Sequence, residues 1–94
     1  MACYITLIRF TEEGAKNIKQ STIRASAFAR AAAKSGVKVE AQYWTAGSYD
    51  GVLVLSAGSE RKALHVLTML VAAGNVRTET MQAFDAKEFK AILG

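Results

Sequence analysis

The sequence contains one cysteine, one histidine and no proline. The lone Cys3 cannot form an internal disulfide, and the usual burial of free cysteine predicts a small buried or half-buried thiol. Zinc and iron sites need three or four ligands, which one histidine, one cysteine and scattered carboxylates do not supply at ligand spacing. No serine lies in the context of a nucleophile elbow. We therefore expect no metal, no cofactor and no catalytic triad, and we assign no catalytic residue.

Long hydrophobic runs are also missing. The longest apolar stretch, residues 63–73, carries His65 and Thr68 and is well short of the roughly 20 residues that span a bilayer. The amino-terminal residues have no basic region before their apolar run and no small-residue cleavage site after it. These observations predict a cytoplasmic protein with no membrane partner.

Acidic residues are fewer than basic ones, which gives a formal net charge of +4. The acids Glu12 and Glu13 begin a long helix, where they complement the helix dipole. Five of the 12 basic residues lie on the same helix: Lys16, Lys19, Arg24, Arg30 and Lys34. This order is typical of a solvated helical face rather than of a nucleic-acid-binding surface. We expect no nucleic-acid partner.

The pattern of apolar and turn residues predicts a β-α-β-β-α-β order followed by a short helix capped by Asp85. Strands are expected over residues 3–10, 37–44, 50–57 and 76–84, and helices over 12–34 and 60–73. Right-handed crossovers then give one domain, residues 1–94, of the α+β class. Its fold is a ferredoxin-like sandwich with an antiparallel four-stranded sheet and both main helices on one face. The other face of the sheet is open.

Both main helices depart from a simple amphipathic pattern. Ile23 falls on the polar side of the first helix, which predicts a kink or a partner contact near residues 20–23. The second helix, over residues 60–73, is apolar nearly all round and needs cover on more than one side. A small two-layer domain cannot give that cover alone. We therefore expect a homo-oligomer, most simply a dimer.

Two segments are more distinctive than the fold class. They are Tyr43-Trp44-Thr45-x-Gly47-x-Tyr49-Asp50 and Gly74-Asn75-Val76-Arg77-Thr78-Glu79-Thr80. Together they resemble the GYD domain family of small bacterial and archaeal proteins, over about residues 4–93. Ser21-Thr22 departs from the serine-proline pair that members often have. The resemblance implies the dimeric α/β-barrel type, in which protomers pair through open sheet faces and often enclose a pocket. The family has no established activity, so no catalytic residue is implied.

Six residues are candidates for ligand binding: Gln42, Trp44, Tyr49, Asp50, Arg77 and Glu79. Regular alternation along residues 37–44 places Trp44 with Gln42 on the open face. Asp50 either bonds backbone amides near a turn, where Gly47 supplies positive φ, or serves as an acceptor or base at a pocket mouth. Arg77 and Glu79 share a strand face, where they form an ion pair or hold an anion-recognising arginine. The sequence does not decide whether Arg77 and Glu79 lie on the open face of the sheet or on the face toward the helices.

Three functions fit these features. The first is a binding module whose open sheet faces form a small-molecule pocket. The second is a cofactor-independent enzyme, similar to a monooxygenase or an isomerase, that uses one acid or base. The third is a structural or assembly protein without a ligand. RNA recognition is not expected, because residues 51–55 of the third strand lack the aromatic side chains on which bases stack.

Overall fold

Four strands and four α-helices make up the structure, a computed structural model that describes all 94 residues. The strands are β1 (Ala2–Phe10), β2 (Lys38–Trp44), β3 (Gly51–Ala57) and β4 (Val76–Ala83). The helices are α1 (Glu12–Lys16), α2 (Ser21–Lys34), α3 (Glu60–Ala72) and α4 (Ala86–Leu93), with a 3-10 turn at Ile18–Gln20. Every expected element is present, and no expected bound shifts by more than one residue, although the expected helix over 12–34 is divided into α1, the 3-10 turn and α2.

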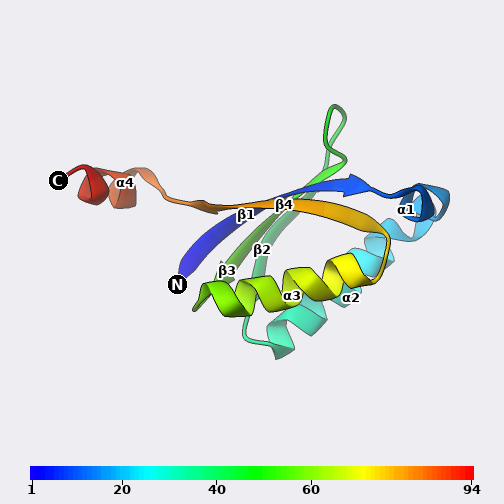
Figure 1. Cartoon of the computed structure of the whole chain (residues 1–94), viewed down its shortest axis with the longest axis horizontal. Coiled ribbons are helices and arrows are strands. Elements are labelled where there is room, and N and C mark those ends of the chain that lie inside the picture. Colours follow the sequence, from blue (N-terminus) through cyan, green and yellow to red (C-terminus); the bar gives the residue numbers. More distant parts are fainter.

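The strands form one antiparallel sheet in the order β2-β3-β1-β4. Helices α2 and α3 lie along one side of this sheet, and no helix covers the other side (Figure 1). This arrangement confirms the α+β, ferredoxin-like fold with an antiparallel four-stranded sheet and a short C-terminal helix. The central position of β1 follows from the apolar character of both its faces.

The core fills the space between the sheet and the two helices. Leu53 and Leu55 of β3 are buried there, together with Phe28 of α2 and Val66 of α3. Burial of each such side chain stabilises the fold by about 1.5–3 kcal/mol. Val54 alternates with these leucines and is therefore half-buried on the open face of the sheet. Each strand thus has one face toward the helices and one face toward the open side.

Strand β2 contains a bulge at Glu40. Val39 pairs with Leu55, but Ala41 pairs with Val54, so one residue of β2 has no partner on β3. An extra residue reverses the alternation of every side chain that follows it. Gln42 and Trp44 consequently face the helices, while Tyr43 faces the open side. The expectation that Trp44 lies on the open face is wrong for this reason.

The first helical segment is broken before α2. Helix α1 ends at Lys16, and Asn17 precedes the 3-10 turn, so the break lies just ahead of the expected kink at residues 20–23. Gly14 of α1 packs against the Gly74-Asn75 turn so closely that an added Cβ would stand 2.0 Å from the carbonyl oxygen of Asn75. Thr11 reinforces this contact with a hydrogen bond from its backbone N–H to the same oxygen, at 3.0 Å.

Helix α4 lies at the end of an extended arm, away from the rest of the molecule (Figure 1). Asp85 and Glu88 form a capping box at its start, with each side chain bonded to the other residue's backbone N–H. Its apolar residues Phe89, Ile92 and Leu93 are exposed. None of the helices has the length and hydrophobicity that crossing a membrane requires.

Candidate functional site

A cavity of about 360 Å³ lies between the helix-covered face of the sheet and helices α2 and α3. Of its 20 lining residues, 14 are hydrophobic, so an occupant must present a mainly apolar surface. The side chains that line it come from all four strands and from α2 and α3, and they include Ile8, Phe10, Phe28, Leu53 and Leu70. A mainly apolar cavity of this volume is of the size that proteins use for small ligands.

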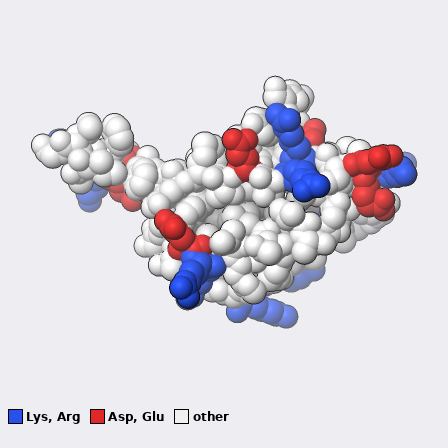
Figure 2. Space-filling model, viewed as in Figure 1, with Lys and Arg blue, Asp and Glu red and all other residues white.

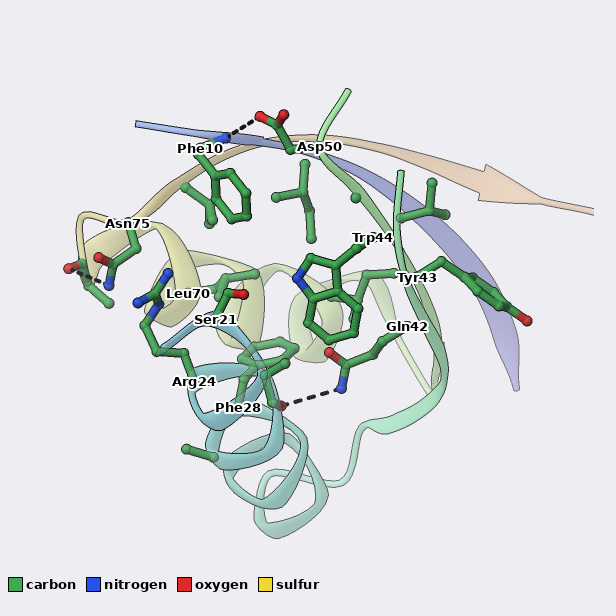
Figure 3. Close-up of a pocket in the computed structure, with 18 of the residues that line it drawn as sticks. Phe10, Ser21, Arg24, Phe28, Gln42, Tyr43, Trp44, Asp50, Leu70 and Asn75 are labelled. Carbon is green, nitrogen blue, oxygen red and sulfur yellow. Dashed lines mark hydrogen bonds between the residues drawn. The ribbon is translucent and has the colours of Figure 1, made fainter. Parts of the chain in front are cut away.

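Trp44 forms one wall of the cavity. Figure 3 shows its indole ring pointing into the space between the sheet and the helices, whereas the ring of the neighbouring Tyr43 points away. Trp44 retains 49% exposure, which places the ring at the mouth rather than in the core. Gln42, two residues earlier, donates a hydrogen bond from Nε2 to the backbone oxygen of Ala25 on α2, at 3.3 Å. This bond helps hold β2 against α2.

Asp50 also lines the cavity, but its carboxylate has a structural partner. Its Oδ2 accepts a hydrogen bond from the backbone N–H of Phe10 at 2.8 Å, and its own N–H donates to the oxygen of Ile8 at 2.8 Å. Asp50 thus extends the connection between β1 and β3 beyond the strand end. Gly47, at the tip of the same hairpin, has a φ of +145°, as the turn requires.

Arg24 is the one lysine or arginine among the residues that line the cavity. Its Nη1 donates a hydrogen bond to the backbone oxygen of Asn17 at 2.8 Å, whereas Nη2 is buried and has no hydrogen-bond partner. The expectation that Arg24 belongs to a solvated helical face is therefore wrong. Its spacing from Ser21 and Phe28, three residues before it and four after it, is the sequence signal that places it on the inner side of the helix.

The remaining three candidates lie on the open face, apart from the cavity. Tyr49 donates a hydrogen bond from its hydroxyl to Oε2 of Glu79 at 2.8 Å. The guanidinium of Arg9 lies over the Tyr49 ring, 4.6 Å from its centroid. Arg77 is opposite Arg9 in the pairing of β1 with β4, and it forms no ion pair with Glu79. The six candidates therefore divide into a cavity group and an open-face group.

The carboxylate of the bulge residue Glu40 has two polar neighbours, Ser56 and Lys38. Ser56 donates a hydrogen bond from Oγ to Oε2 of Glu40 at 2.6 Å, and the ammonium of Lys38 lies 3.5 Å from Oε1. The Ser56 hydrogen bond and, to a smaller extent, the charge of Lys38 hold the pKa of the Glu40 carboxyl below its usual value. Nowhere in the chain do three or more histidine, cysteine or acidic side chains gather as metal ligands.

The sheet order, the helices on one face and the cavity between them define an α+β sandwich of the ferredoxin-like class. The family model for the GYD domain matches residues 4–93, so the chain belongs to the GYD domain family. This membership confirms the resemblance carried by the hairpin and β4 motifs.

A curated relative and a solved structure, both from Thermus thermophilus, are similar to this chain over nearly its full length. The glutamine synthetase and cystathionine beta-lyase binding protein is 29% identical over 94 residues, which are 99% of this chain and 99% of that protein. The crystal structure of TTHA0845 superposes with a TM-score of 0.60 and 27% identity, and the match covers 92% of this chain and 96% of that one.

Proposed function

We propose that residues 1–94 form one cytoplasmic small-molecule-binding domain that works as a homo-oligomer. The observation that carries the proposal is the mainly apolar cavity with Trp44 at its mouth. The ligand site thus lies between the sheet and the helices, and the open sheet face is left for contact with a second copy. Gln42, Trp44 and Asp50 belong to the ligand site, whereas Tyr49, Arg77 and Glu79 belong to the contact between copies.

Binding in the cavity is tested by filling it from α2. Ala25 lines the cavity, so Ala25→Leu would occupy part of the volume that a ligand needs. Native mass spectrometry of the wild-type protein from cells would detect a retained ligand, and titration with a screen of neutral apolar compounds would shift the Trp44 emission. We expect Ala25→Leu to abolish both signals. Ala33→Leu, on an exposed position of the same helix, should preserve them. Wild-type protein that gives neither signal would overturn the proposed binding function.

Self-association is supported by the character of the open face. Its centre is built from apolar side chains that no helix covers: Ile5, Leu7, Val52, Val54 and Met81. Arg9, Arg77 and Glu79 lie beside them toward one end of the strands. A second copy of the chain would remove the apolar centre from water, which is the main driving force for association.

Light scattering tests this contact. Val54→Asp introduces a charge at the centre of the open face, and we expect it to produce a monomer that still folds. Lys34→Glu, a charge change at the exposed end of α2, should leave the oligomer intact. A wild-type protein that scatters as a 10.1 kDa monomer at micromolar concentration would overturn the proposed contact.

A second candidate function is the binding of another protein through α4. The relative from Thermus thermophilus is named for binding two enzymes, and α4 presents exposed apolar residues at the end of an arm. On the face shown in Figure 2, this end of the molecule is mostly uncharged, with charged side chains along its lower edge. Purified glutamine synthetase and cystathionine beta-lyase are the probes. Phe89→Ser with Ile92→Ser should abolish any binding, whereas Lys87→Ser should not. If the protein binds neither of the two enzymes, this candidate function is excluded.

A further inference from the structure

We propose that the cavity selects small molecules that combine an apolar body with a carboxylate, and that the guanidinium of Arg24 binds this carboxylate. The inference rests on the proposed binding function and adds the chemical class of the ligand. It assigns a role to an arginine that lies outside the two motifs of the hairpin and of β4.

The single side-chain hydrogen bond of Arg24 fixes Nη1 of its guanidinium and leaves Nη2 without a partner. Nη1 is held by the backbone oxygen of Asn17, which orients the planar group against the junction between α1 and the 3-10 turn. Nη2 is removed from water and has no acceptor. A buried charged donor without a partner is costly, and a ligand oxygen that displaced the side chains around Nη2 would remove this cost.

The walls around Arg24 match a ligand with one polar end. Figure 3 shows Arg24 and Asn75 together on one side of the cavity and Trp44 on the other side. Phe10 and Phe28 are among the apolar residues that complete the lining. An aromatic or aliphatic body would therefore lie against these rings while its carboxylate reaches the polar side.

The charges of the cavity favour a single anionic group. Arg24 supplies one positive charge, and the one lining carboxylate, Asp50, already accepts the backbone N–H of Phe10. One carboxylate on the ligand would balance Arg24 through a charge-assisted hydrogen bond, for which a guanidinium is well suited. A ligand with several negative charges would leave most of them in apolar surroundings, which is unfavourable.

A purely structural role accounts for only part of this geometry. If Arg24 served only to tie α2 to Asn17, the Nη1 hydrogen bond would be sufficient. It would not explain why a second donor nitrogen of this cavity-lining residue is buried without an acceptor. Glutamine at this position retains a side-chain N–H donor and loses the charge. Arg24→Gln therefore tests the charge in particular.

The experiment compares carboxylates with uncharged analogues of nearly the same shape. Isothermal titration calorimetry would measure binding of 3-phenylpropionate against 3-phenylpropionamide, and of octanoate against octanamide, so that two different apolar bodies are covered. We expect wild-type protein to bind the carboxylate about 10-fold to 100-fold more tightly than the amide, as for one charged hydrogen bond. Arg24→Gln should lose this preference and keep its amide affinity. Arg24→Lys should keep part of the preference for the carboxylate.

The other outcomes distinguish failure of the carboxylate inference from failure of the binding function. Equal wild-type affinity for acid and amide would overturn the carboxylate inference and leave the binding function standing. The same holds if all four probes fail while neutral apolar compounds still shift the Trp44 emission. If neutral compounds also fail, the binding function and the inference both fall. A lower melting temperature of Arg24→Gln with an unchanged acid preference would assign Arg24 a structural role and overturn its role in recognition.

Discussion

Gln42 and Ala25 are joined by a 3.3 Å hydrogen bond from the side-chain Nε2 to the backbone oxygen, and this bond links β2 to α2. The contact exists only because the bulge at Glu40 turns Gln42 toward the helices. In a regular strand, Gln42 and Trp44 would share a face with Lys38 and point to the open side. One extra residue in an edge strand therefore makes Trp44 a wall of the cavity.

The bulge gives a first prediction. Deletion of Glu40 should restore regular alternation in β2, so that Trp44 leaves the cavity or the strand loses its register with β3. In either case we expect a red-shifted Trp44 emission and a lower melting temperature. Deletion of Ser48, in the exposed hairpin loop, is the matched control and should change neither by much. Equal effects of the two deletions would show that the bulge does not position Trp44.

The order and the bounds of the elements follow from local pattern, which is why they are predictable from the sequence. Residues 3–10 and 50–57 are mainly apolar, as buried strands are. Gly36 and Gly74 end the preceding helices with positive φ. The resemblance to the GYD domain family likewise rests on two local motifs, and the family model matches residues 4–93. These features depend on neighbouring residues only, so one sequence contains the information.

The direction in which the side chains of β2 point, and the role of Arg24, both depend on contacts between distant segments. No residue near Glu40 marks a bulge, because the pairing of β2 with β3 decides it. The spacing of Arg24 from Ser21 and Phe28 indicates the inner side of the helix, but the cavity beside Arg24 forms only when α2 is docked on the sheet. The face of Arg77 and Glu79 is likewise set by the register of β4 against β1. The candidate site is therefore predictable only in part.

The contact of Gly14 with the Gly74-Asn75 turn gives a second prediction. A Cβ at position 14 would meet the carbonyl oxygen of Asn75 at 2.0 Å and its carbonyl carbon at 2.9 Å, and backbone cannot move aside as a flexible side chain does. Gly14→Ala should therefore lower the free energy of unfolding by about 1–3 kcal/mol, despite the better helix propensity of alanine. Urea denaturation measures this change. Ala15→Ser, at the exposed neighbouring position, should cost less than about 0.5 kcal/mol.

The hydrogen bond from Ser56 to Glu40 gives a prediction about pH. The folded state lowers the pKa of Glu40, so the charged carboxylate contributes stability above its unfolded-state pKa, and this contribution is lost as the pH falls through the lower folded-state pKa. Ser56→Ala removes the largest cause of the shift. We expect the Glu40 pKa to rise toward its usual value in an NMR titration, and the acid-dependent part of the stability to shrink. An unchanged pKa in this variant would assign the shift to Lys38 instead.

The last prediction separates the two aromatic neighbours at the end of β2. Trp44 points into the cavity and Tyr43 points away from it, although both are about half exposed. An apolar ligand would cover the indole ring, so binding should shift the Trp44 emission to shorter wavelength. Because stacking and burial against one large ring contribute about 1–3 kcal/mol, Trp44→Ala should weaken the binding of a cavity ligand by about 10-fold or more. Tyr43→Ala should leave that affinity unchanged and act instead on association of the open faces, which light scattering measures. If Tyr43→Ala weakened ligand binding as much as Trp44→Ala did, the ligand would lie on the open face, and the assignment of the cavity as the binding site would be wrong.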